Sequence, residues 1–551
     1  MADPALPTLD DARALLEPAE MLLEGALARA REITKQGAAI DDHQVLAERI
    51  AYAATEARAA RELVDFVTRT KAEGRADALL EATAAAGTAD LVWSLATRLA
   101  PSADDLGIGD DVFLSAFPSD VRKRLRAVGS EAVFRAIGRA VGQRRGRNET
   151  PLDDTLEQVR AAVREFAEKE IAPHAERIHR HDETIPEEFI TKMAELGYFG
   201  LSVPEEYGGT EMGNLAMILT TEELSRASLA GAGSLITRPE ILTKALMAGG
   251  TEEQKKHWLP RISAGELMVG ISVTEPDVGS DVASVKCRAD RATVGGREGW
   301  VINGPKAWCT FAGRANILAL LARSDGNPAS GARGLSLFIV EKEPTREHAF
   351  KQTQPGGGVL EGKADATIGY RGMHSYTCQF ENWFVPAENL VGGEGGLGKG
   401  FYLQMGGFAA GRLQTGGRAC GLAQAALEKS AEYVLDRIQF GKPTIEFGLT
   451  QYELGRMAAR LAAARAITYA AAEVMDADER KAAPLAAQAK LLSCDIAVEI
   501  AQKGQVLHGG WGYAEEYAIS RYTVDALVLP IFEGVRPILA LKVVARNLLG
   551  S

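Results

Sequence analysis

The chain has 551 residues, of which 46% are hydrophobic and 25% charged, and its formal net charge is −12. This length exceeds what one hydrophobic core usually serves, so we expect two to four domains. The acidic balance disfavours a nucleic-acid partner, and no apolar run approaches the roughly 18 residues of a membrane span. Five scattered cysteines without CxxC spacing indicate neither disulfides nor a zinc site. Because no basic and apolar leader is visible at the start, we expect a cytoplasmic protein without a membrane partner.

The first part of the chain, residues 9–147, is rich in Ala, Leu, Glu and Arg, which is a helix-forming composition. Between residues 45 and 57, apolar side chains recur at steps of three and four, the pattern of a helix with one buried face. A polar and glycine-containing stretch with Asn148 and Pro151 then marks a domain boundary. We therefore predict a helical N-terminal extension over residues 1–150.

The rest of the chain divides into three parts. Residues 151–268 again show helical periodicity, and residues 393–551 return to it. Between them, residues 269–392 contain short apolar runs separated by Gly, Asp and Asn turns, which indicate strands. The clearest of these runs are 300–304, 317–321 and 335–340. The sequence thus predicts an α+β multidomain protein in the order helical, helical, β and helical.

Two patterns that suggest other chemistry are not supported by their surroundings. The glycine-rich segment 392–400 contains a GxGxxG match, but Gly400 stands where a P-loop needs Ser or Thr, and Pro386 breaks the segment in front of it. We interpret this segment as a loop. The histidines at 174, 179 and 181 share no helical face, so we predict no metal site.

Glu533 is the strongest catalytic candidate. It follows the apolar run 528–532 and precedes Gly534, so we expect a poorly hydrated carboxylate that can serve as a base near neutral pH. Three further segments carry a recognisable pattern, and they are Ser272–Asp281, Arg437–Pro443 and Gly509–Tyr513. Together with Glu533 they resemble the acyl-CoA dehydrogenase family in content, order and rough spacing. The resemblance covers residues from about 153 to 551.

This resemblance implies a fold and a reaction. The fold has an N-terminal helical domain, a middle β-barrel or β-sandwich domain and a C-terminal four-helix bundle, here preceded by an extra helical extension. The reaction is the FAD-dependent α,β-dehydrogenation of an acyl-CoA thioester. In the family pattern, Glu533 removes the α-proton and the β-hydrogen leaves as hydride to flavin N5. The developing enolate oxygen accepts hydrogen bonds from the Glu533 N–H and a flavin hydroxyl, because a thioester α-proton is otherwise too weakly acidic.

The resemblance also assigns binding residues. Those implied to contact FAD are Ile271, Ser272, Val273, Thr274, Trp308, Thr310, Arg437, Phe440, Gln505, Gly509 and Gly510. Arg437 and Phe440 match residues that one subunit lends to its neighbour's FAD, which implies a homodimer or a homotetramer. An electron-transferring flavoprotein is the implied electron acceptor. The residues implied on the substrate side are Ser280, Arg238, Arg371 and Gly534.

The extension indicates a branch of the family. Most members begin near this chain's residue 153, and the extension together with residues 237–241 resembles the branch that converts (2S)-methylsuccinyl-CoA to mesaconyl-CoA in bacterial C2 assimilation through the ethylmalonyl-CoA pathway. Such a substrate has a second carboxylate that needs a cation, and Arg238 is the first candidate, with Arg371 and His374 as alternatives.

Three other functions remain open on the sequence. A short-chain or branched-chain acyl-CoA dehydrogenase of other specificity would use the same Glu533 chemistry. An acyl-CoA oxidase would turn over with dioxygen alone. A non-catalytic, flavin-bearing nucleic-acid binder on this fold would need a basic surface, which the acidic composition disfavours.

Overall fold

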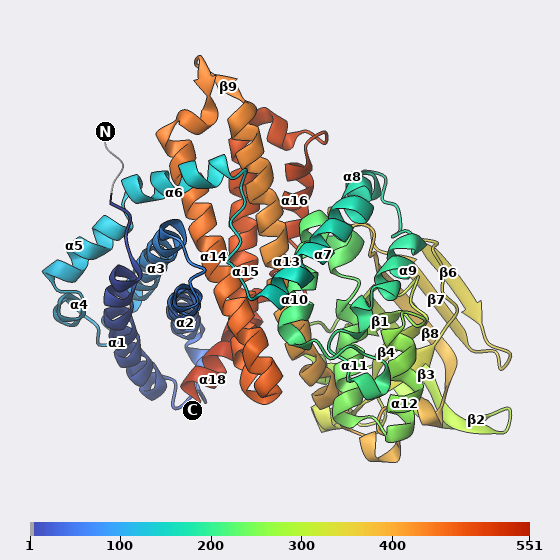
Figure 1. Cartoon of the computed structure of the whole chain (residues 1–551). Helices are drawn as coiled ribbons and strands as arrows, with labels where there is room; N and C mark the ends of the chain where they lie inside the picture. Colours follow the sequence, from blue (N-terminus) through green and yellow to red (C-terminus); the bar gives the residue numbers. More distant parts are fainter. Residues whose placement is uncertain (1–4, 551) are drawn as a thin grey trace. The chain divides into compact units, whose positions relative to one another are not determined.

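The computed structural model describes residues 5–550 and divides into two compact units (Figure 1). The first unit joins the chain up to Ala162 with the chain from Thr415 onward, and the second unit runs from Val163 to Gln414. The elements follow the order helical, helical, β and helical, which confirms the predicted fold class.

In the first unit, the described part of the extension is built from six α-helices. They are α1 (Leu9–Ile33), α2 (Gln44–Ala72), α3 (Ala78–Leu99), α4 (Asp110–Ala116), α5 (Ser119–Val128) and α6 (Glu131–Gln143). The start of α3 shows how the sequence sets a boundary: the Asp77 carboxylate accepts a hydrogen bond from the Leu80 N–H at 2.7 Å. Alanine is the most frequent residue at the buried positions of α2 and α3, so these helices can approach closely.

The C-terminal part of the chain is helical as well. Its elements are α13 (Gly400–Asp436), the short strands β9 (Ile438–Gln439) and β10 (Lys442–Pro443), α14 (Gly448–Ala477), α15 (Glu479–Leu507), α16 (Ala518–Ala526), α17 (Arg536–Ile538), a π-helix (Leu539–Ala545) and α18 (Arg546–Leu549). A membrane-spanning helix, which must be both long and apolar, does not occur among the described residues.

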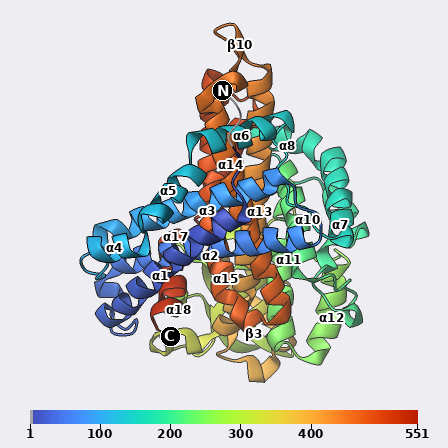
Figure 2. The same cartoon turned by 60° about the vertical axis from the view of Figure 1, so that its left-hand side comes forward.

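The extension shares a core with this C-terminal part. Helices α6 and α14 cross at two glycines (Figure 2). A Cβ on Gly138 would lie 1.8 Å from the Gln451 carbonyl oxygen, and a Cβ on Gly455 would lie 1.9 Å from that of Phe134. Only glycine permits such a close backbone approach at both positions.

Polar contacts reinforce the same interface. Asp90 on α3 pairs with Arg456 at 2.8 Å and with Arg460 at 2.6 Å, both on α14. The Tyr52 hydroxyl of α2 donates to the Asp495 carboxylate of α15 at 2.9 Å. The extension is therefore an integral part of the first unit.

The second unit begins with helices and continues into a sheet. The helices are α7 (Asp154–Phe166), which starts in the first unit, a π-helix (Ala167–Ile171), α8 (Ala172–Arg180), α9 (Glu187–Glu195), α10 (Gly213–Ala227), a second π-helix (Leu229–Gly233), α11 (Thr237–Gly249) and α12 (Glu252–Ser263). Buried side chains of α11 and α12 pack with strand residues such as Val269 and Ile317 in one hydrophobic cluster.

The sheet contains eight strands in the order β1-β4-β2-β3-β8-β7-β6, with β5 paired to β4. They are β1 (Val269–Ser272), β2 (Arg288–Val294), β3 (Arg297–Thr310), β4 (Ile317–Arg323), β5 (Leu335–Glu341), β6 (Ala349–Thr353), β7 (Val359–Ala364) and β8 (Ser375–Pro386). The three runs predicted as strands lie in β3, β4 and β5, so those predictions are confirmed. Strand β1 pairs in parallel with β4, and β3 pairs with β8 through two register shifts, the second between Lys306 and Cys309. This irregularity positions part of the candidate site.

Candidate active site

Glu533 lies on a constrained turn between α16 and α17. Its φ is 54° and that of Gly534 is 103°, so two successive residues are left-handed. A left-handed non-glycine residue costs about 1–3 kcal/mol and persists only where its surroundings hold it. Here the Lys490 ammonium donates to the Gly534 carbonyl at 2.8 Å, and the Arg536 N–H donates to the Pro530 carbonyl at 2.9 Å. The carboxylate of Glu533 is half-buried, and these two hydrogen bonds hold the turn that carries it.

A second buried cation supports the same turn. Arg418 on α13 is fully buried, and its guanidinium carbon lies 4.6 Å from the ring centroid of Phe532. The guanidinium also donates to the Thr415 hydroxyl at 2.6 Å. Burial raises the pKa of the Cys494 thiol to about 12, while the charges of Lys490 and Arg418 act in the opposite direction. Both cations therefore act on the same interior region beneath the turn.

The second unit carries the predicted flavin contacts on and after β1, which are Ile271, Ser272, Val273 and Thr274. A buried ion pair fixes this strand end: Glu275 and Lys306, 4% and 0% exposed, lie 3.0 Å apart. The Lys306 ammonium also donates to the Val273 carbonyl at 2.9 Å. The Ala307 N–H donates to the Thr274 carbonyl at 2.8 Å. These contacts therefore hold the end of β1 and the end of β3 next to each other.

Trp308 and Thr310 lie at this end of β3. Trp308 occupies the register shift in β3 with a φ of 57°, and it is 59% exposed, an unusual combination for a large aromatic residue. The Thr310 hydroxyl hydrogen-bonds with the Ser375 hydroxyl at 3.0 Å. The Ser272 hydroxyl lies 3.3 Å from the Cys309 sulfur. The four predicted flavin contacts on and after β1 therefore lie near Trp308 and Thr310. The exposed indole of Trp308 offers a surface on which a flat ring system can stack.

Arg437 and Phe440 belong to the β9–β10 hairpin of the first unit, near the label β9 in Figure 1. Phe440 is at its tip, 93% exposed and with a φ of 51°, and Gly441 next to it has a φ of 80°. The Phe440 ring approaches the Phe447 ring edge-on, with centroids 6.1 Å apart.

The turn after α15 carries the remaining predicted FAD contacts. Its 3-10 helix (Gly509–Tyr513) begins with Gly509 at a φ of 61° and Gly510, and a Cβ on either residue would meet no atom within 4 Å. The Gln505 amide donates to the Gly512 carbonyl at 3.1 Å, so this side chain organises the turn. The diglycine backbone is exposed and open to a ligand.

The predicted substrate residues occupy different environments. Ser280 is exposed on the loop after the β1 turn, whereas Arg238 is 3% exposed in the first turn of α11. Gly534 uses its carbonyl to accept from Lys490, as described above.

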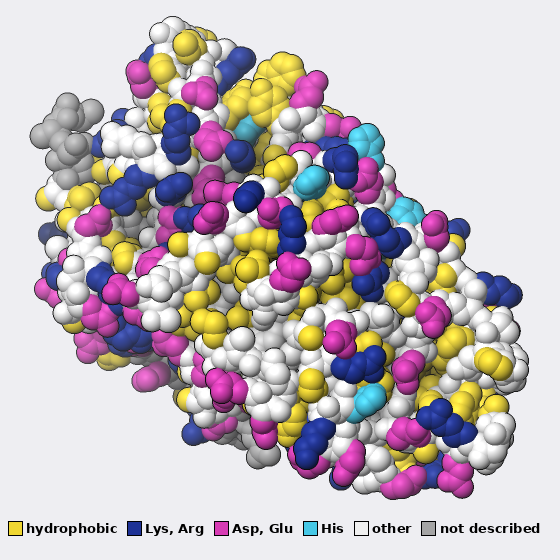
Figure 3. Space-filling view, turned by 45° about the vertical axis from the view of Figure 1, so that its right-hand side comes forward, with side chains coloured by type: hydrophobic (Ala, Val, Ile, Leu, Met, Phe, Trp, Pro, Cys, Tyr) yellow, Lys and Arg dark blue, Asp and Glu magenta, His cyan; other side chains and the backbone are white. Residues whose placement is uncertain are grey.

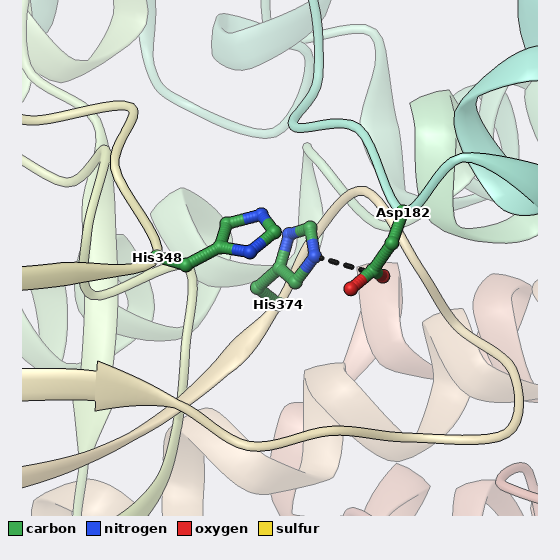
Figure 4. Close-up of side chains that lie close together, drawn as sticks. All are labelled: Asp182, His348 and His374. Atoms are coloured by element: carbon green, nitrogen blue, oxygen red, sulfur yellow. Dashed lines mark hydrogen bonds and ion pairs between the residues drawn. The ribbon is translucent and has the colours of Figure 1, made fainter.

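Arg371 lies beside a cluster of Asp182, His348 and His374 that the sequence did not indicate, and Figure 4 shows these three side chains. His374 Nε2 lies 3.1 Å from an Asp182 carboxylate oxygen, and Arg371 Nε lies 3.6 Å from the same oxygen. The His348 and His374 rings are tilted by 42° to one another with centroids 4.4 Å apart. Arg371 also donates to the His179 carbonyl at 3.2 Å. Burial lowers the pKa of His374, against the attraction of Asp182.

The same cluster could offer a metal ion three ligand atoms within 4.8 Å of one another. The carboxylate already has a guanidinium and an imidazole beside it, so we interpret the cluster as a link between the end of α8 and the loop before β8. Its members are distant in sequence, which is why the histidine spacing gave no sign of it.

Sequence reasoning also missed Lys490 and Arg418. Each is a charged residue within a largely apolar, alanine-rich helical stretch, at 1% and 0% exposure. Both could have been found from the sequence, because helical periodicity assigns each of these charged residues to a core position. Elsewhere acidic and basic side chains are interspersed, as on the face in Figure 3.

The fold, with helical, β and helical parts in that order, is one of flavin-dependent oxidoreductases. Family models agree: the N-terminal, middle and C-terminal domains of acyl-CoA dehydrogenases match residues 153–266, 270–383 and 398–549. The chain belongs to the acyl-CoA dehydrogenase family, and it is an FAD-dependent enzyme with acyl-CoA dehydrogenase activity.

Relatives differ in how much of the chain they cover. The (2S)-methylsuccinyl-CoA dehydrogenase of Cereibacter sphaeroides is 36% identical over 100% of this chain and 98% of its own. The mitochondrial 2-methylacyl-CoA dehydrogenase of Solanum tuberosum is 37% identical over 72% of this chain and 91% of its own. Among solved structures, butyryl-CoA dehydrogenase from Megasphaera elsdenii superposes with a TM-score of 0.66 at 28% identity, covering 73% of this chain and all of its own. Glutaryl-CoA dehydrogenase with bound glutaryl-CoA gives a TM-score of 0.61 at 30% identity over 71% of this chain and 94% of its own.

Proposed function

We propose that this enzyme oxidises (2S)-methylsuccinyl-CoA to mesaconyl-CoA. The observation that carries the proposal is the full-length match, extension included, to a methylsuccinyl-CoA dehydrogenase, whereas the plant 2-methylacyl-CoA dehydrogenase matches 72% of the chain. The extension shares a core with α14 and α15 and is therefore part of the enzyme's architecture.

Glu533 is the proposed base. In this proposal it takes the proton from Cα of the thioester, and its backbone N–H donates to the thioester oxygen as charge develops there. The left-handed turn, whose Gly534 carbonyl accepts from Lys490, supports this role. A positioned general base typically contributes about 10²–10⁴-fold in rate. FAD, when bound, accepts the β-hydrogen as hydride.

The residues present fit FAD. The exposed, strained Trp308 and the tied ends of β1 and β3 suit the ring system, and Thr310 offers a hydroxyl that can donate to it. The open backbone of Gly509 and Gly510 suits the pyrophosphate side, with Arg437 supplying charge. These assignments rest on the family pattern together with the local geometry.

The second carboxylate of the substrate needs a positive partner, and we assign Arg238 to it. A carboxylate buried without a cation costs several kcal/mol. Arg238 is 3% exposed and lies at the start of α11, where the helix dipole also favours an anion. Arg371, which lies beside Asp182, is the second candidate. A structural relative at 30% identity holds glutaryl-CoA, another thioester with a free carboxylate.

The test is anaerobic bleaching of the bound flavin by a panel of thioesters. Methylsuccinyl-CoA should bleach it fastest, and Glu533→Gln should retain FAD while bleaching slows by about 10²–10⁴-fold. Arg238→Met should raise KM for methylsuccinyl-CoA and spare an uncharged thioester. Preference for an uncharged acyl-CoA would refute the substrate and leave the dehydrogenase, and oxygen consumption without an added acceptor would indicate an oxidase.

We further propose a cytoplasmic homodimer or homotetramer that passes electrons to an electron-transferring flavoprotein. Phe440, 93% exposed at its hairpin tip, supports a contact in which one subunit completes its neighbour's FAD site. Phe440→Ala should then lower FAD retention and subunit association together, which sedimentation and flavin absorbance measure. A monomeric variant with full FAD content would contradict this arrangement.

A further inference from the structure

The second unit buries several polar side chains whose polar atoms have no hydrogen-bond partner among the residues that the structure describes. Gln404 and Gln414 on α13 are 0% and 2% exposed, and neither amide nitrogen nor amide oxygen is bonded. Thr237, the first residue of α11, is 0% exposed with an unbonded hydroxyl. Buried polar atoms are nearly always hydrogen-bonded in folded proteins, and exceptions need an explanation.

Helix geometry places two of these side chains at one end of α11. Helices α11 and α13 approach closely where a Cβ on Gly407 would lie 2.6 Å from the Ile241 carbonyl oxygen, and a Cβ on Gly249 would lie 2.4 Å from the Leu403 side chain. The two contacts run in opposite directions along the chain, so the helices are antiparallel. Residues of α13 after Gly407 therefore lie toward the start of α11.

The two glutamines lie on the same face of α13 but at different positions along the helix axis. Gln404, Gly407 and Gln414 follow steps of three and seven residues, which fall on one side of an α-helix. Gln414 is about 10 Å beyond Gly407 at a rise of about 1.5 Å per residue, on the side of Thr237 and Arg238. Gln404 is about 15 Å from Gln414 along the helix axis, toward the other end of α11.

We propose that Gln414 and Thr237 are specificity-determining residues that donate hydrogen bonds to the free carboxylate of the acyl group, beside Arg238. This inference rests on the proposed function. A carboxylate has two oxygens that each accept more than one hydrogen bond, so an amide, a hydroxyl and a guanidinium can bind it together. The start of α11, a helix of 13 residues, adds its positive dipole end.

The same groups would reject an uncharged acyl chain. An apolar tail in this place would leave the Gln414 amide and the Thr237 hydroxyl buried without partners. Sites built to hydrogen-bond a substrate discriminate strongly against an analogue that lacks the group. The polar end of α11 therefore explains both selection of a dicarboxylic thioester and exclusion of fatty acyl groups.

The experiment compares two thioesters of the same branching. Methylsuccinyl-CoA and 2-methylbutanoyl-CoA differ in one terminal group, carboxylate against methyl. Gln414→Leu and Thr237→Val should each lower kcat/KM for methylsuccinyl-CoA by about ten- to a hundred-fold, the usual effect of a lost hydrogen bond to a charged group, and leave or raise it for 2-methylbutanoyl-CoA. Gln404→Leu, an equally buried glutamine about 15 Å away, should leave the ratio of the two substrates unchanged.

Three results separate the possibilities. If Gln414→Leu and Thr237→Val lower both substrates equally while FAD content is retained, these residues are structural and the inference is wrong. If Gln414→Leu does not fold, Gln414→Glu decides, because an added negative charge should repel only the dicarboxylic thioester. If the wild-type enzyme itself prefers 2-methylbutanoyl-CoA, both this inference and the proposed substrate fail.

Discussion

Replacing Lys490 by Met removes the cation that holds the turn of the proposed base. Lys490 is 1% exposed, and its ammonium lies 2.8 Å from the Gly534 carbonyl oxygen. A hydrogen bond to a charged group contributes about 1.5–3 kcal/mol, while the left-handed φ of Glu533 costs about 1–3 kcal/mol. Because the two terms are similar, loss of the hydrogen bond lets the turn relax. The carboxylate and its N–H then move from the reacting position together.

The expected effect falls on the chemical step. A loss of about 1.4–2.8 kcal/mol of transition-state stabilisation corresponds to a ten- to a hundred-fold slower reaction. Anaerobic stopped-flow bleaching of the flavin measures this step directly. We expect a slower limiting rate with unchanged FAD content and with a thioester dissociation constant near that of the wild type. Lys490→Arg keeps a cationic donor and should recover part of the rate.

Two outcomes would refute this reasoning. If Lys490→Met unfolds at a lower temperature but bleaches at the wild-type rate, the lysine only stabilises the fold. If Lys490→Arg is as slow as Lys490→Met, the charge-assisted hydrogen bond is not what positions Glu533.

The remaining predictions concern stability and the retention of FAD. Asp90→Ala removes a carboxylate that Arg456 and Arg460 share but leaves both arginines paired with Glu499. It should lower the free energy of unfolding by about 1.5–3 kcal/mol, measured by urea titration, and an unchanged midpoint would mean that the extension is only loosely attached. Lys306→Met leaves Glu275 buried without its cation, so the variant should lose FAD during gel filtration, and full retention would contradict the role given to this pair. Burial lowers the pKa of His374 below its ordinary 6.5, so the unfolded chain binds a proton that the folded chain does not. The contribution of His374 to the free energy of unfolding is therefore present above pH 6.5 and is lost as the pH falls below that value. In His374→Gln the urea midpoint should decline less between pH 7.5 and 5 than in the wild type.

Local sequence patterns predicted most of the fold and suggested the catalytic candidate. Alternation between short apolar runs and turns predicted β3, β4 and β5, because strand formation there follows from neighbouring residues. For the same reason the apolar flank of Glu533 made it the candidate base, an assignment that stays a prediction. Its left-handed backbone was not predictable, since glutamate has no intrinsic preference for that conformation and the turn is imposed by Lys490, 43 residues earlier in the chain.

Contacts between distant segments could not be derived from the pattern. The glycines of the α6–α14 crossing, Gly138 and Gly455, are ordinary helical residues in the sequence and acquire meaning only when the two backbones meet. The contact between Asp182 and His374 likewise could not be predicted, because the two residues do not belong to one helix or strand.

The extension changes how the C-terminal helices are stabilised. Asp90, Tyr52 and Gly138 each contact α14 or α15 at positions that are buried or nearly so, and α15 is also the helix that carries Lys490. A close helix crossing limits the movement of both partners, since interiors pack at nearly crystalline density. The extension therefore supports, through α15, the lysine that closes the turn of Glu533. Its place in the fold links residues far from the chemistry to the orientation of the proposed base.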